Sequence, residues 1–300
     1  MKVNRVVVKN NLYNQNFNGK FKSPLDIEDT CSILKNTVWY RSEEAFPEKY
    51  GKKASLLLNL IKNMTGIEYL NLTQKQKIIL DHVMPKSIMR DADRNYDIAG
   101  LLRIYMSKHF GDFKDYTILS IGRSLATCCE TLRHMGADIK FLPMSGLREN
   151  NSIYKITPRG VAAYGKYLSS IGLSKEQIRN NPTHKYIIMD YTCTGNSLKN
   201  AHEFLTLDEL LSKAPNIETL KTEDCLDWIY NGILSGQLLK MYSPIEQLHL
   251  GELENVFAAA DPYKYDYHNY RNSSKQIMTK LFRLRMFEIL DSNNELKLLV

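Results

Sequence analysis

The stretch KYIIMDYTCTGNSL, residues 185–198, decides the fold. Its first half is an apolar run that is rich in β-forming residues and ends on Asp190. A polar turn with a glycine follows, and NSLKNAHEFL (196–205) then has apolar residues at helical spacing. A buried strand, a tight loop and a helix in this order are typical of one unit of a parallel α/β sheet.

Two similar units precede this one along the chain. The apolar runs YTILSI (116–121) and ADIKFLP (137–143) each predict a strand. The helices that should follow them cover about 125–136, which ends in Gly136, and 157–173, which has Thr157 as N-cap and Pro158 as first residue. The repeated strand–loop–helix order predicts a parallel sheet with crossover helices.

Ligands of such sheets bind beyond the carboxyl ends of the strands. The loops that follow the three predicted strands are residues 122–124, 144–152 and 191–195. Because parallel strands all end at the same edge, we expect these loops to line one cleft.

The turn after Asp190 has the composition of an anion-binding site. Hydroxyl groups, a glycine and the N–H groups of a helix start can surround a phosphate. The Asp190 carboxylate could accept hydrogen bonds from ribose hydroxyls or help to hold Mg²⁺, which prefers oxygen ligands. The residues predicted to contact the ligand here are Tyr191, Thr192, Cys193, Thr194, Gly195, Asn196 and Ser197.

This segment resembles the phosphoribosyl pyrophosphate motif of the type I phosphoribosyltransferases. That family has an apolar strand, two adjacent acids, a short spacer, and Thr-Gly with a small hydroxyl residue at a helix start. Asp190, Thr194-Gly195 and Ser197 match this pattern, and Tyr191 stands in place of the second acid. The resemblance implies that Asp190 contacts the ribose hydroxyls and that the Thr-Gly loop holds the 5-phosphate.

The loops upstream are similar to two further parts of the same family. Gly122-Arg123-Ser124 has the place of the pyrophosphate-binding loop, where Arg123 would add a bidentate phosphate partner. The polar loop at 145–152 has the place of the loop that closes over the site, with Arg148 as its cation. The resemblance therefore implies group transfer at ribose C1, with Asp190 and Arg148 as catalytic residues and Mg²⁺ as cofactor, held in part by Asp190.

Three regions are expected along the chain. Residues 1–110 predict a helical N-terminal region and residues 111–210 the phosphoribosyltransferase-like α/β core. Residues 211–300 predict a helical C-terminal region or hood, and the three together are expected to form one compact unit.

Other functions fit the same motif. Tyr191 in place of an acid favours a non-catalytic nucleotide or phosphoribosyl pyrophosphate sensor. A protein-interaction module on this fold, whose helical ends bind a partner, is a further alternative. Asp-x-Thr-x-Thr after an apolar strand is also reminiscent of haloacid-dehalogenase phosphohydrolases, in which Asp190 would be the nucleophile. That function would leave the loop at 122–124 unexplained.

Composition limits the cell compartment and the partners. The formal net charge of +7 suits a phosphorylated ribose or a nucleotide and leaves nucleic acid open as a partner. The five cysteines are scattered without metal-ligand spacing, which favours a reducing compartment. The apolar run at Val6–Val8 is too short for a signal peptide, and no run approaches the roughly 20 residues that cross a bilayer. We therefore expect a cytoplasmic protein that does not enter membranes.

Overall fold

The computed structural model describes residues 86–147, 155–190, 195–221, 242–245, 248–260 and 271–297. For residues 86–87, 221 and 271–280 it describes the backbone only. By its contacts the chain divides into two units, and every described residue belongs to the unit formed by 61–71 and 86–300.

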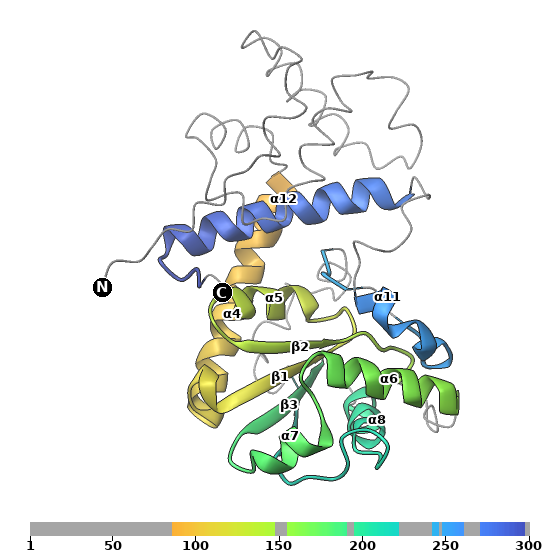
Figure 1. Ribbon diagram of the computed structural model, residues 1–300. Helices are drawn as coiled ribbons and strands as arrows, with labels where there is room; N and C mark the ends of the chain where they lie inside the picture. The colour runs from red at the N-terminus through yellow and green to blue at the C-terminus, as the bar shows by residue number, and fades with distance from the viewer. Residues whose placement is uncertain are drawn as a thin grey trace, which may run out of the picture. The chain divides into compact units, whose positions relative to one another are not determined.

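Four parallel strands form one open sheet in the order β2-β1-β3-β4 (Figure 1). The strands are β1 (Tyr116–Ile121), β2 (Asp138–Leu142), β3 (Lys185–Asp190) and β4 (Ile217–Lys221). The registers place Ser120 of β1 beside Met189 of β3 and beside Phe141 of β2. The prediction of an α/β fold with a parallel sheet is confirmed at this level.

Helices cover both faces of the sheet. On one face lie α4 (Lys86–Phe110), α5 (Ala126–His134) and α12 (Arg271–Ser292), and on the other lie α6 (Pro158–Ser170), α7 (Lys175–Asn180) and α8 (Asn196–Leu205). The 3-10 helix η4 (Leu250–Asn255) and α11 (Val256–Ala260) pack against α6, and a short 3-10 turn, η2 (Phe113–Asp115), precedes β1.

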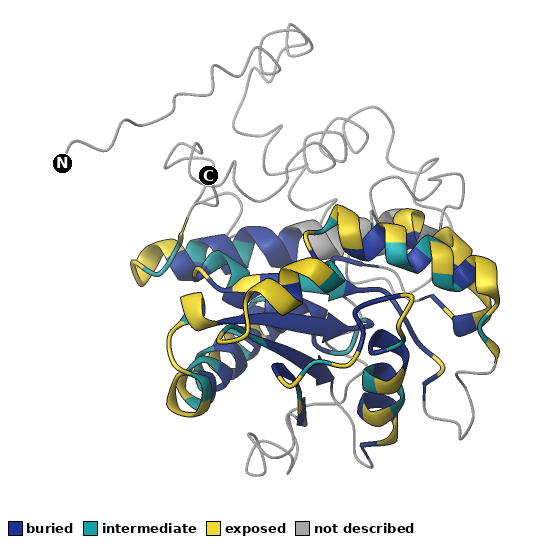
Figure 2. Cartoon of the chain, turned by 60° about the horizontal axis from the view of Figure 1, so that its bottom comes forward, coloured by how far each residue is buried: buried dark blue, intermediate teal, exposed yellow. Residues whose placement is uncertain are grey.

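The alternation of side chains along each strand divides the core into two halves. In β1, Tyr116 and Ile118 pack on the α5 side, whereas Leu119 and Ile121 pack on the α8 side. All six residues of β1 are buried, and Figure 2 shows the strands as a buried layer between helices whose outer faces are exposed. A strand buried on both faces reads as a continuous apolar run, which is why YTILSI is such a clear signal.

The predicted helix boundaries agree closely with α5, α6 and α8. Thr157 is the N-cap of α6, and its hydroxyl accepts a hydrogen bond from Gly160 N at 3.0 Å. Gly136, just beyond α5, has a φ of +106°, a conformation that glycine adopts without strain.

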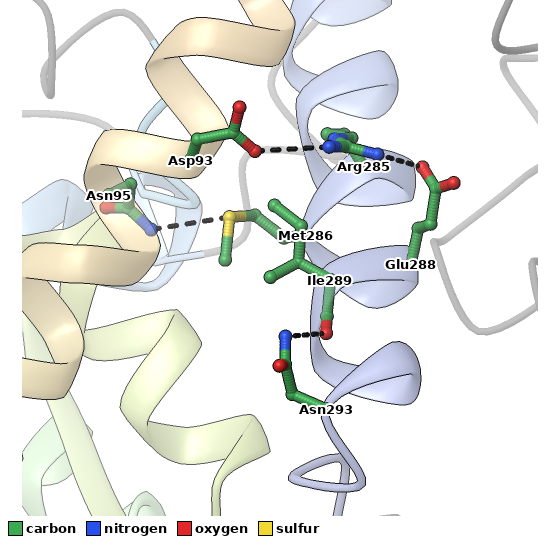
Figure 3. A network of polar contacts seen from close by, with 7 residues as sticks. All are labelled: Asp93, Asn95, Arg285, Met286, Glu288, Ile289 and Asn293. Atoms are coloured by element: carbon green, nitrogen blue, oxygen red, sulfur yellow. Dashed lines mark hydrogen bonds and ion pairs between the residues drawn. The ribbon is translucent and has the colours of Figure 1, made fainter.

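Polar side chains join α4 to α12 (Figure 3), and a further one joins α4 to α5. Arg285 of α12 bridges Asp93 of α4 at 3.2 Å and Glu288 at 2.7 Å. Deeper in the interface, the Asn95 amide donates to Thr131 Oγ1 at 2.7 Å. The C-terminal helix is thereby tied to the layer that covers β1.

Two elements were missed by the sequence analysis, and both are short. α7 was not predicted, although Ser174 caps it by accepting from Gln177 N at 3.2 Å. β4 lies beyond residue 210, where the α/β core was expected to end, so the sheet extends into the region predicted to be helical. In the rest of the region predicted to be helical, the structure describes η4 from Leu250, α11 and α12, and residues 222–241 lie outside the described residues.

Asn216, at the entry to β4, provides a test of this arrangement. Its side-chain nitrogen lies 3.3, 3.0 and 2.9 Å from the carbonyl oxygens of Ile178, Asn181 and His184. We expect Asn216→Ala to lower the free energy of unfolding by about 2 kcal/mol, because it removes the hydrogen bonds that a buried side-chain amide makes to this loop. Urea denaturation measures this loss.

Asn293→Ala is the matched control for that variant, because it removes one side-chain hydrogen bond at an exposed position, from the Asn293 amide to the Ile289 carbonyl at 2.8 Å. Equal losses for the two variants would contradict the role assigned to Asn216.

Candidate functional site

The three predicted loops begin at one edge of the sheet. β1 lies between β2 and β3, so Ile121 ends beside Leu142 on one side and next to Asp190 on the other. The chain leaves β1 toward the α5 face and leaves β3 toward the α8 face. Neighbouring strands whose chains diverge in this way mark the crevice in which open α/β sheets bind ligands.

Gly122 brings the loop after β1 against the loop after β2. Its N–H donates to the Leu142 carbonyl at 2.8 Å, and its φ is +60°. A Cβ at this position would lie 2.8 Å from the Met144 carbonyl oxygen, closer than real Cβ contacts come. Glycine is thus required here for two reasons, the backbone conformation and the close approach. Arg123 and Ser124 follow it and are half-buried.

The N-terminus of α8 opens at the same edge. Gly195 is its N-cap, in a left-handed conformation with a φ of +76°, and the first turn of α8 carries no acidic residue. The first N–H groups of a helix have no partner within the helix and carry a partial positive charge. An anion can therefore bind at this helix end without repulsion from the first turn.

Ser197 carries an independent sign of a ligand at this helix end. Its side chain is only 5% exposed, yet its Oγ has no hydrogen-bond partner among the residues that the structure describes. A buried hydroxyl without a partner costs free energy. A phosphate oxygen at the start of α8 would supply the missing partner. Asn196, the residue before it, is exposed.

Asp190 is the last residue of β3 and is buried, with 8% of its surface exposed. Tyr186 and Ile188 pack on the α8 side of the sheet, so the alternation along β3 places Asp190 on that side too. Its carboxylate thus belongs to the face on which α8 begins. Tyr191, Thr192, Cys193 and Thr194, with Arg148, lie outside the described residues.

Two contacts that the sequence did not reveal hold the loop after β2 at this edge. Asn200 of α8 donates its side-chain amide to the Leu147 carbonyl at 2.6 Å. On the other side, Ser145 forms a parallel bridge with His249, and its N–H donates to the Leu248 carbonyl at 2.8 Å. Since the partners are 53 and 104 residues apart in the chain, no local pattern could have paired them.

The described residues contain no group of three His, Cys, Asp or Glu side chains that could hold a metal ion. Asp190 supplies one carboxylate at the edge. One carboxylate does not complete a Mg²⁺ site, so an ion bound here would also take oxygen ligands from a bound phosphate and from water.

Cys128 and Cys129 of α5 are fully buried on the sheet. Burial raises the pKa of Cys129 to about 12. These two thiols are therefore protonated packing groups and take no part in chemistry at neutral pH.

Hollows elsewhere on the surface do not coincide with this edge. One, of about 520 Å³, is lined by the C-terminal half of α6, the start of α7 and residues 208–210. A second, of about 330 Å³, lies between α4 and α12. Neither contains any of the predicted site residues.

The fold and the edge define an α/β protein with an open parallel sheet and a candidate anion site where β1 and β3 diverge. Comparison of the chain with protein-family models, with curated proteins and with solved structures finds no match in any of the three. Within the described ranges, no helix is long and apolar enough to cross a membrane.

The close approach at Gly122 can be tested by substitution. We expect Gly122→Ala to lower the free energy of unfolding by about 2 kcal/mol or more, since it adds left-handed strain to a clash with Met144 O. Gly172→Ala is the control, because Gly172 has a φ of +77° and open space around it. Urea denaturation should show a larger loss for Gly122→Ala, and equal losses would mean that the two loops do not meet as described.

Proposed function

We propose that the carboxyl edge between β1 and β3 binds a ribose 5-phosphate ligand of the phosphoribosyl pyrophosphate type. The observation that carries this proposal is the buried, unpartnered hydroxyl of Ser197 at the start of α8. It supports a bound oxyanion at the helix end, where the N–H groups and the helix dipole also favour one.

Each part of such a ligand has a group that suits it. The 5-phosphate binds at the N-terminus of α8, between Gly195 and Ser197. The Asp190 carboxylate, at the end of β3 on the same face of the sheet, accepts hydrogen bonds from ribose hydroxyls. The loop that follows Gly122 offers backbone N–H groups to a pyrophosphate on C1. Bound Mg²⁺ would neutralise charge on the pyrophosphate and would be held by its oxygens and by Asp190.

Group transfer at ribose C1 follows from the resemblance to the type I phosphoribosyltransferases. In that reaction the protein's part is to position the ligand and to stabilise the departing pyrophosphate. Tyr191 in place of the second acid favours the alternative of a sensor that binds the same ligand without turning it over. Release of pyrophosphate from phosphoribosyl pyrophosphate separates the two, because only the enzyme produces it.

Thermal unfolding tests the binding proposal directly. Phosphoribosyl pyrophosphate with Mg²⁺ should raise the Tm, since a ligand at 100 times its Kd stabilises the folded state by about 2.7 kcal/mol. Asp190→Asn should abolish the rise while the Tm without ligand stays close to that of the wild type. Glu209→Gln, at an exposed acid beyond the far end of α8, should keep it. A wild-type Tm unmoved by phosphoribosyl pyrophosphate, ribose 5-phosphate and nucleotides would refute the proposal.

Ser197→Ala should have opposite effects on stability and on affinity. Without ligand, the variant should be as stable as the wild type or more stable, because it removes a buried hydroxyl that has no partner. Its affinity for ribose 5-phosphate, measured by calorimetry, should fall by about tenfold, the effect of one hydrogen bond to a charged group.

Ser170→Ala is the control for that variant, since the Ser170 hydroxyl bonds the Tyr167 carbonyl at the far end of α6. A loss of stability without a loss of affinity in Ser197→Ala would show that the hydroxyl has a structural partner instead.

A further inference from the structure

A histidine from the C-terminal third of the chain lies beside the loop after β2, at the carboxyl edge of the sheet. Leu248 and Leu250 are buried and anchor the backbone on both sides of His249, whose own side chain is exposed. The His249 carbonyl accepts from Glu252 N at 2.8 Å, and the His249 N–H donates to the Glu252 carboxylate at 3.4 Å. These contacts hold His249 in place where η4 begins.

The ring of His249 is oriented by the loop after β2. Its Nδ1 lies 3.4 Å from Ser145 Oγ, which in turn donates to the Leu248 carbonyl at 3.2 Å. Ser145 Oγ is therefore the acceptor for an Nδ1 proton. Gly146, with a φ of +81°, lies beside the ring, since a Cβ there would be in ordinary contact with Nδ1 at 3.7 Å.

Nε2 is the nitrogen that remains for a ligand. Within the described ranges of the chain it has no hydrogen-bond partner, and the side chain that carries it is exposed. An imidazolium donates through both nitrogens, so one ring can reach Ser145 with Nδ1 and an anionic oxygen with Nε2.

The position of His249 along the sheet edge indicates which part of the ligand it meets. Its bridge partner, Ser145, follows β2, which is two strands away from β3, or about 10 Å at the usual strand spacing. Along this edge, the start of α8 follows β3, whereas the Gly122 loop follows β1, the strand next to β2. The Gly122 loop, between the two, abuts the Met144 carbonyl next to Ser145.

We propose that His249 binds the pyrophosphate attached to C1 of the ribose, at the opposite end of the ligand from the 5-phosphate. This inference rests on the proposed function. It assigns to the C-terminal region a direct part in distinguishing phosphoribosyl pyrophosphate from ribose 5-phosphate.

Two substitutions separate ligand binding by Nε2 from support of the loop by Nδ1. The amide of an asparagine can take the place of Nδ1 but not of Nε2, whereas the longer glutamine can present a donor near the place of Nε2. Calorimetry with Mg²⁺ should show that His249→Asn lowers the affinity for phosphoribosyl pyrophosphate by about tenfold. The affinity for ribose 5-phosphate should fall by less than about twofold. His249→Gln should recover part of the lost affinity. His109→Asn, at an exposed histidine at the far end of α4, should behave as the wild type.

The other outcomes each overturn the inference. Unchanged affinity for phosphoribosyl pyrophosphate in His249→Asn would remove His249 from the site. An equal loss for both ligands would mean that the ring only supports the loop. If His249→Asn instead lowers the affinity for adenosine monophosphate and not that for phosphoribosyl pyrophosphate, the ring contacts a base. If the wild type binds neither ribose phosphate, the proposed function itself fails, and that result is distinct from the other three.

Discussion

The burial of β1 on both faces is the constraint on which the rest of the structure depends. β1 pairs in parallel with β2 on one side and β3 on the other, and none of its residues reaches solvent. Parallel neighbours can be joined only by crossovers, and a strand buried on both faces needs a helical layer on each. The layer of α4, α5 and α12 and the layer of α6, α7 and α8 meet this need.

The candidate site follows from the same constraint. Every crossover returns the chain to the same end of the sheet, so the strands all end at one edge and α5, α6 and α8 all start from it. The chain turns to opposite faces after β1 and β3, and open α/β sheets bind their ligands at an edge position of this kind. Gly122, directly after β1, and Gly195, at the start of α8, both take up left-handed conformations at this edge.

Much of the fold could be predicted because its signals are local. β1, β2 and β3 are apolar runs, and Thr157 and Gly136 are caps that act within a few residues. The edge strand β4 escaped detection because IETLK is short and half polar, so its pairing with β3 comes from the sheet and not from its own propensity. α7 has only six residues, which is too short a segment to show a helical pattern of apolar residues in the sequence.

The order of the strands and helices could be read from the sequence alone, and so could the residue types around the end of β3, because Asp190, Gly195 and Ser197 lie within one local segment. Only the tertiary structure decided which distant backbones meet at the sheet edge: Gly122 with Met144, Asn200 with Leu147, and Ser145 with His249. Such pairings depend on how the crossovers and the C-terminal segment pack on the sheet. Neither spacing nor residue type encodes that packing, because it is set by the burial of side chains from the whole chain.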